Sequence, residues 1–148
     1  MKGWGKMKYK DYILSVIAIG GGAIASFLGE YTLSLNVLLT LMIVDFILGI
    51  ISAMFNYSTK TVSGGLSSKA GWLGLMKKFT VIMFVGVGFS LDQLLDTHMI
   101  REMVIIGYSA NELISIVEHA GIIGVPVPSV ITKAIDILNQ KADSDING

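Results

Sequence analysis

Residues 31–55, "YTLSLNVLLTLMIVDFILGIISAMF", form a long apolar run with a single charged side chain, Asp45, near its middle. A helix needs about 20 mainly apolar residues, at 1.5 Å rise per residue, to cross the hydrocarbon core of a bilayer. This run meets that requirement without help from its neighbours. The stretch therefore predicts a membrane-spanning helix that carries a carboxyl group at membrane depth.

The whole chain has the composition of a membrane protein. Of its 148 residues 53% are hydrophobic and 15% charged, whereas soluble domains carry about 25% charged residues. We predict a single all-α membrane domain over residues 1–148, a bundle of four transmembrane helices or, in the alternative, three. A short C-terminal amphipathic helix (130–140) and a disordered tail would follow. The predicted spans are 12–29, 31–55, 79–95 and 100–117.

The first apolar segment has two interpretations. Four lysines precede it, which is the pattern of a secretory signal peptide, and small residues at 23–26 offer a cleavage site. The apolar run nevertheless continues to Leu28, and a longer one follows at once. We therefore favour a retained first span.

The basic residues predict the orientation. With four spans, both termini and the loop 56–78 lie on one side of the membrane, and ten of the eleven basic residues then lie on that side. The positive-inside rule makes this side cytoplasmic. Within the loop we expect Lys69, Lys77 and Lys78 to act as anchors at the membrane surface. A three-span topology fits less well, because it separates the C-terminal lysines from the others.

Small residues mark the helix faces that can pack closely. Gly49 and Ala53 follow Asp45 at intervals of four, so a small-residue face carries the buried carboxyl group. Gly22 in the first segment and Gly86 with Ser90 in the third predict further contact faces. The packing could lie within one chain or between subunits.

The fourth segment is amphipathic at membrane depth. Helical spacing gathers its polar residues on one face, which must meet other polar groups or water. The face consists of Tyr108, Asn111, Glu112, Ser115 and Glu118, with His119 as the alternative to Glu118 at the last position. In the four-span topology Asp45 and Glu112 lie at similar depths, and we expect no lysine or arginine there. These residues are therefore predicted as an intramembrane switch or pore lining, with a carboxyl that is protonated or in contact with water. Asp92 and Arg101 are predicted as a pair at the outer side.

Several function classes find no support in the sequence. The chain has no cysteine and two separate histidines, and the common hydrolase and phosphate-binding motifs are missing. We therefore expect no catalytic residue, no cofactor and no metal site, and the chain is predicted not to be an enzyme. Basic clusters with interleaved aromatic residues are also missing, so nucleic acid is not expected as a partner.

An ordered set of motifs resembles the phage lysis and toxin secretion holin family, from about Leu35 to Leu138. The set begins with Asp45, Gly49 and Ala53, continues with "LSSKAGWLGLMKK" (66–78), and passes through Asp92 and Arg101. It closes with "Y-x2-NE-x2-SI-x-E" (108–118) and "GVPVP" (124–128). His119 departs from the pattern, since asparagine is expected there.

The resemblance implies a small protein of the bacterial cytoplasmic membrane that forms homo-oligomers and permeabilises the bilayer. An endolysin or a toxin would be the released cargo, host cell lysis the result, and an antiholin a further partner. Two alternatives remain open: an antiholin-like regulator or scaffold, and a channel for ions or small solutes.

Overall fold

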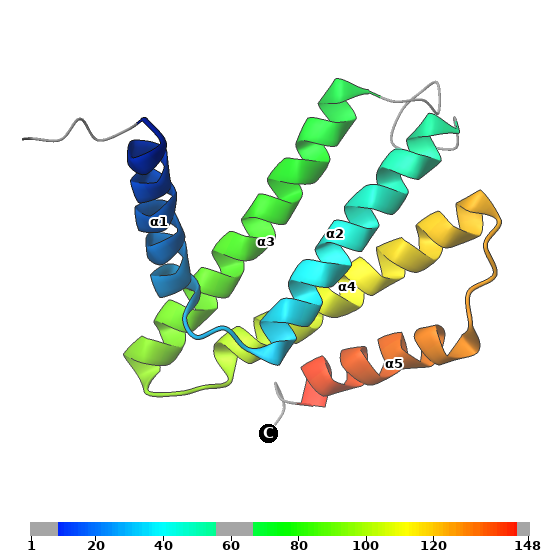
Figure 1. Ribbon diagram of the computed structural model, residues 1–148. Coiled ribbons are helices and arrows are strands. Elements are labelled where there is room, and N and C mark those ends of the chain that lie inside the picture. Colours follow the sequence, from blue (N-terminus) through cyan, green and yellow to red (C-terminus); the bar gives the residue numbers. More distant parts are fainter. Residues whose placement is uncertain (1–8, 56–66, 145–148) are drawn as a thin grey trace, which may run out of the picture.

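The computed structural model describes residues 9–55 and 67–144, and every regular element in these two ranges is an α-helix (Figure 1). The helices are α1 (Tyr9–Leu28), α2 (Leu33–Met54), α3 (Ser68–Leu95), α4 (Ile100–Ile123) and α5 (Ser129–Ser144). Consecutive helices from α1 to α4 run in alternating directions (Figure 1).

Local side-chain chemistry explains where the helices begin and end. The hydroxyl of Thr32 accepts a hydrogen bond from the Leu35 amide at 3.3 Å, and the hydroxyl of Ser67 accepts one from Ala70 at 3.5 Å. Each satisfies an amide that the first turn of a helix leaves unpaired. Gly124 ends α4 in a left-handed conformation with φ of 85°, and Pro126 lies two residues further on.

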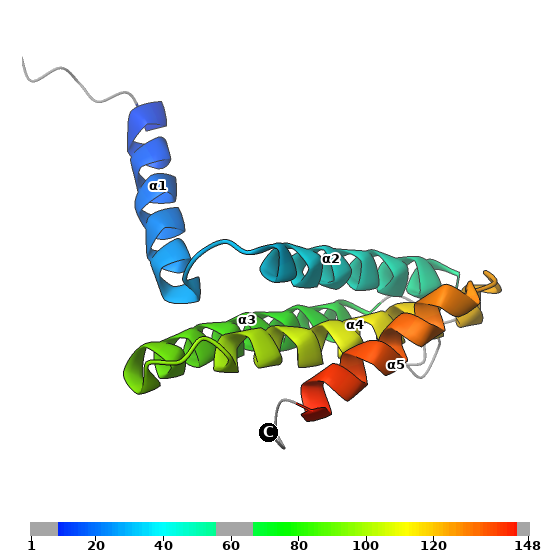
Figure 2. The same ribbon diagram turned by 90° about the horizontal axis from the view of Figure 1, so that it is seen from below.

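Helix α4 organises the packing. It contacts both α2 and α3, while α2 and α3 scarcely touch each other, and α5 packs against α4. Figure 2 shows α2 lying over α3 and α4, with α5 returning along the outer side of α4. The buried apolar cluster lies among α2, α3 and α4, with one member at the end of α1: Leu28, Leu35, Leu38, Met42, Val81, Val85 and Ile105.

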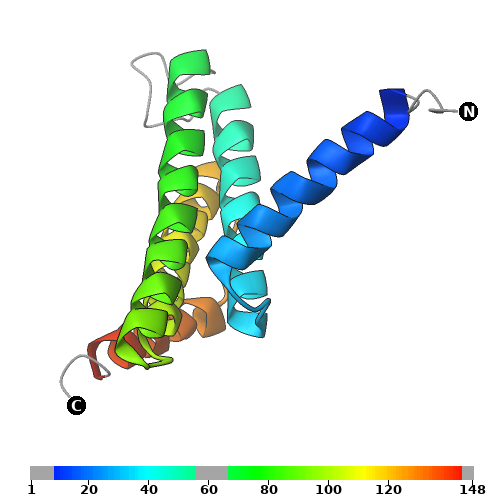
Figure 3. The same ribbon diagram turned by 90° about the vertical axis from the view of Figure 1, so that its left-hand side faces the viewer.

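Helix α1 projects away from the other helices (Figure 3). Leu28 is its only buried residue, and the Phe27 ring occupies the space where Gly86 of α3 lacks a side chain. Gly86 is therefore a contact between helices, as its small size suggests. The structure leaves Gly22 with no atom near the position of a Cβ, so this predicted contact face meets no described neighbour within the chain.

The turn between α3 and α4 is held by Asp92. Its carboxylate accepts hydrogen bonds from the amides of Ile100 (3.0 Å) and Arg101 (2.9 Å) and from the hydroxyl of Thr97 (2.5 Å). A negative charge at the first turn of a helix also interacts favourably with the helix dipole. Asp92 thus fixes the start of α4 against the end of α3.

The predicted pairing of Asp92 with Arg101 takes a different form. Asp92 contacts the backbone of Arg101, whereas the guanidinium donates to the carbonyl of Glu30 at 2.5 Å and lies 5.9 Å from the centre of the Phe89 ring. Both residues are buried. The two residues are in contact, but through the Arg101 amide, because the orphan amides of α4 compete successfully for the carboxylate.

Three of the described helices, α1, α2 and α3, are long and apolar enough to cross a membrane. Large apolar side chains are exposed along all three, including Ile17 (63%), Ile43 (61%) and Phe79 (58%). Water would disfavour such a surface, whereas lipid would solvate it. The prediction of an all-α membrane protein is confirmed at this level.

Three helix boundaries differ clearly from those expected. Helix α4 continues to Ile123, beyond the predicted end at residue 117. Helix α3 begins at Ser68 rather than at residue 79, so 68–78 belongs to a helix and not to the predicted loop. Helix α5 extends to Ser144 and includes part of the predicted disordered tail. Residues 56–66 and 145–148 lie outside the described ranges.

Gly88 provides a test of the contact between α3 and α4. A Cβ at this position would lie 3.0 Å from the Arg101 Cα and 3.3 Å from its amide nitrogen, and backbone atoms cannot swing aside. Gly88→Ala is expected to destabilise the protein by about 1–3 kcal/mol, the usual effect of overpacking. Thermal unfolding of the purified protein in detergent, followed by circular dichroism, measures the effect.

Gly74→Ala in the same helix is the matched control. A Cβ there would meet no atom within 4 Å, so helix propensity alone predicts an unchanged or slightly higher stability. Equal stabilities of the two variants would mean that α3 and α4 are not in the close contact described.

Candidate functional site

A cluster of ionised side chains joins α2, α3 and α4. The Lys78 ammonium group donates to the carboxylate of Asp45 at 2.9 Å and also to the carboxylate of Glu112. The side chains of Lys78, Asp45 and Glu112 are only 14%, 10% and 8% exposed, respectively. One lysine thus neutralises part of the charge of two carboxylates that come from different helices.

His119 extends this cluster along α4. Its Nε2 lies 3.6 Å from Asp45 Oδ1, and its Nδ1 lies 3.4 Å from the hydroxyl of Ser52. The ring lies against Gly49, where a Cβ would make an ordinary van der Waals contact with Nε2 at 3.5 Å. Asp45 therefore faces Lys78 with one carboxylate oxygen and His119 with the other.

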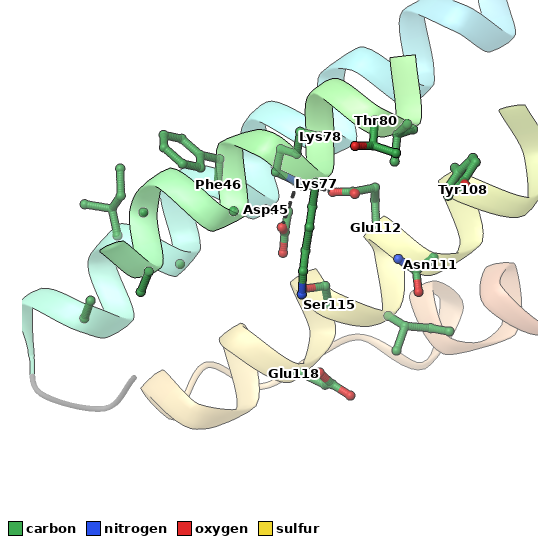
Figure 4. A pocket seen from close by; sticks show the side chains of 18 of the residues that line it. Asp45, Phe46, Lys77, Lys78, Thr80, Tyr108, Asn111, Glu112, Ser115 and Glu118 are labelled. Carbon is green, nitrogen blue, oxygen red and sulfur yellow. Dashed lines mark hydrogen bonds and ion pairs between the residues drawn. The ribbon is translucent and has the colours of Figure 1, made fainter. Parts of the chain in front are cut away.

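The ion cluster forms part of a groove of about 610 Å³ between α2, α3 and α4. Figure 4 shows Asp45 and Glu112 pointing toward Lys78, with Lys77 extending across the groove toward Ser115. Several residues on the α2 and α3 sides of the groove are small, so their side chains fill little of it: Gly49, Ala53, Ala70, Gly71 and Gly74. The groove combines a charged floor with walls that leave room for water or another molecule.

All six residues predicted as an intramembrane switch or pore lining contribute to this groove. Asp45 and Glu112 are buried, Tyr108 and Ser115 are half-buried, and Asn111 and Glu118 are exposed. The Tyr108 ring lies 6.1 Å from that of Phe84, which orients it against α3. The expected meeting of Asp45 with Glu112 takes place through Lys78.

The remaining predicted residues have different surroundings. Gly49 and Ala53 line the groove, whereas Ser90 is exposed and its hydroxyl donates to the Gly86 carbonyl at 2.9 Å. Lys69 lies exposed in the first turn of α3, and Lys77 is also exposed.

The position of Lys78 corrects one expectation. It was predicted as an anchor in a surface loop, and no basic residue was expected at the depth of the carboxylates. The structure places it well inside α3, where it pairs with both. The cluster therefore needs no neutral carboxyl to be accommodated.

Ser52 was not predicted as a member of the site, and His119 was predicted only as the alternative to Glu118 on the polar face. The signal for Ser52 was present, because it lies beside Gly49 and Ala53 on the small-residue side of α2. His119 follows Glu112 by seven residues, and this spacing places both side chains on the same helical face. An isolated histidine gives no indication of its partners.

The arrangement suits charge compensation and conformational coupling. Asp45 and Lys78 lie on α2 and α3, which are apolar enough to span a membrane and on which an unpaired charge would be costly. Through Lys78, Glu112 links α4 to these two helices. Any separation of these helices would require water to enter the groove.

Removing the lysine tests this coupling. Lys78→Met keeps the length of the side chain but leaves two buried carboxylates without their cation, and breaking a buried ion pair in this way destabilises by about 3–5 kcal/mol. Denaturant unfolding in detergent measures the loss. Lys77→Met, the control at the adjacent exposed position, is expected to change stability by less than about 0.5 kcal/mol.

A triple variant separates charge from folding defects. Asp45→Asn and Glu112→Gln in the Lys78→Met background remove the two unpaired charges, so most of the lost stability should return. If the triple variant is no more stable than Lys78→Met alone, the charges do not account for the effect.

Comparisons with known proteins agree with these features. The model of the bacteriophage holin family matches residues 22–140. The uncharacterized protein Lmo0128 of Listeria monocytogenes is 36% identical over 91% of this chain and 93% of its own length. A protein named "Probable holin" from Bacillus phage phi105 is 31% identical over 75% of this chain and 81% of its own.

A Clostridium perfringens protein of 14.9 kDa is 33% identical over 76% of this chain and 82% of its own length. No solved structure matches the chain. The family match suggests a non-enzymatic protein, and together with the three apolar helices it supports a membrane location. The match covers the ion cluster and most of the described helices, and the chain belongs to the bacteriophage holin family.

Proposed function

We propose that this protein is a holin that oligomerises in the bacterial cytoplasmic membrane and forms lesions through which an endolysin or a toxin leaves the cell. The observation that carries the proposal is the buried Lys78–Asp45–Glu112 cluster, which lines an open groove between apolar helices. Family membership and the phage relative named as a probable holin support it.

In this proposal α4 is a fourth span. Its alternating direction relative to α3 supports this topology (Figure 1), as does its polar face, which is directed into the groove rather than toward lipid. Both termini and the segment between α2 and α3 would then face the cytoplasm. The three-span alternative would place α4 at the membrane surface, where Lys78 of α3 and Asp45 of α2, which share the ion cluster with Glu112, would have to follow it.

The ion cluster would hold the monomer in a closed state. While Lys78 pairs with both carboxylates, the polar face of α4 is satisfied within one chain. Opening of the cluster would turn the same face toward water, and in a membrane the polar faces of several subunits can enclose that water together. Asp45 and Glu112 are the proposed switch residues for this change.

Oligomers would form through surfaces that the single chain leaves unused. Helix α1 is almost entirely exposed, and the positions beside Gly20, Gly21 and Gly22 are empty within the chain. Small residues allow helices to approach closely in lipid, where no hydrophobic drive brings them together. These glycines are therefore proposed contacts between copies. Endolysin or toxin remains cargo in this scheme, and an antiholin would compete for the same faces.

The experiment that tests the function is inducible expression in bacteria together with a cytoplasmic muralytic enzyme that lacks an export signal. Optical density and membrane potential are recorded together. A delay, followed by abrupt lysis that coincides with depolarisation, is expected from a holin. Depolarisation without lysis would instead indicate a channel, and neither effect, with the protein in the membrane, would indicate a regulator or scaffold.

Asp45→Asn tests the switch in the same assay. The substitution removes a charge that binds α2 to Lys78 and faces His119, so the closed state is weakened and lysis should begin earlier at equal protein levels. Membrane insertion should be unchanged, because an amide is easier to bury than a carboxylate. Asp136 is exposed on α5, and the control variant Asp136→Asn should keep the original timing. Unchanged timing for Asp45→Asn at normal protein levels would contradict the switch.

A further inference from the structure

His119 lies at the contact between α2 and α4 with 9% of its side chain exposed. Its two ring nitrogens face two groups of α2, Ser52 and Asp45. The ring is therefore a polar contact between α4 and α2. Its protonation state decides which of these contacts are attractive.

Hydrogen-bond donors and acceptors can be assigned around the ring. The Ser52 hydroxyl lies 2.9 Å from the Leu48 carbonyl, which can only accept, so the hydroxyl proton is used there. The Ser52 oxygen is then an acceptor for an N–H at His119 Nδ1, 3.4 Å away. A neutral ring with this tautomer would direct the lone pair of Nε2 at the Asp45 carboxylate.

The facing oxygen, Asp45 Oδ1, is buried and makes no hydrogen bond of ordinary length, although the Ser115 hydroxyl also interacts with this carboxylate. Lys78 contacts the other oxygen of the same carboxylate. A buried acceptor that lacks a donor destabilises the folded state. A proton on Nε2 supplies that donor, and a small approach of the ring from 3.6 Å would complete the bond.

The balance of charge favours the same state. With a neutral His119, the cluster has two carboxylates and one ammonium group and therefore a net charge of −1 in a poorly solvated site. With an imidazolium, the charges cancel. Lys77 of α3 and Glu118 of α4 are exposed, as are the charged groups of α5, the helix that packs against α4: Lys133, Asp136, Lys141 and Asp143. Lys77 and Glu118, which line the groove, carry opposite charges.

We propose that His119 is a proton-binding site, occupied in the closed state, whose imidazolium links α4 to α2. It donates from Nε2 to Asp45 and from Nδ1 to Ser52. The bound proton completes a cluster of two carboxylates and two cations. Loss of this proton leaves Asp45 Oδ1 without a donor and weakens the contact between the two helices.

The site does not depend on lesion formation, so its test uses the purified full chain. The protein is prepared with isotope-labelled histidine in lipid nanodiscs, and the ring nitrogen resonances are followed by NMR across a pH series. Only two histidines contribute, and a His98→Gln variant assigns the signals. The exposed His98 serves as the internal reference.

The expected spectrum shows both nitrogens of His119 protonated at neutral pH. Asp45→Asn should abolish this protonation at the same pH, and the exposed control Asp136→Asn should preserve it. A neutral His119 ring of either tautomer in the folded wild-type protein would overturn the proposal, as would an imidazolium that persists in Asp45→Asn. Circular dichroism of Asp45→Asn checks that the variant is folded, and the wild-type spectrum alone decides whether the imidazolium is present.

Discussion

A charge in a low-dielectric environment needs a partner, and this requirement explains the packing of the helices around α4. Asp45 and Glu112 would each be strongly unfavourable on an isolated apolar helix. Lys78 makes both tolerable, but only when α2, α3 and α4 are together. Helices α2 and α3 have little direct contact with each other. The ion cluster and the apolar core that they share with α4 therefore keep both helices packed against α4.

This cluster differs in kind from the apolar core. Leu38 and Val85 pack against neighbours that lipid could replace at little cost, because lipid tails are as apolar as leucine. No lipid tail can replace Lys78 beside Glu112. The specificity of the arrangement therefore depends more on a few polar contacts than on the many apolar ones. The groove that Lys78, Asp45 and Glu112 line has room for water beside their ion pairs.

The sequence predicted the helical class, the apolar segments and the polar face of α4, since each follows from periodicity or composition. It did not predict the partner of Asp45. The pair Lys77–Lys78 resembles the charged boundary of a membrane span, and hydropathy alone places the start of the helix after it. The structure begins α3 at Ser68 instead, so Lys78 enters the bundle. Likewise, Asp92 and Arg101 were correctly recognised as neighbours, but the competition of backbone amides for a carboxylate has no signal in side-chain charge.

The capping of α4 by Asp92 has a mechanical consequence. This carboxylate binds the first two amides of α4 to the end of α3, so the beginning of α4 acts as a fulcrum. Glu112 lies eleven residues beyond Arg101, a lever arm of about 16 Å at the helical rise. A tilt of about ten degrees about that fulcrum displaces the Glu112 end by roughly 3 Å, which is enough to exchange a direct ion pair for a water-separated one. Small rotations at one rim of the protein are thus amplified at the other.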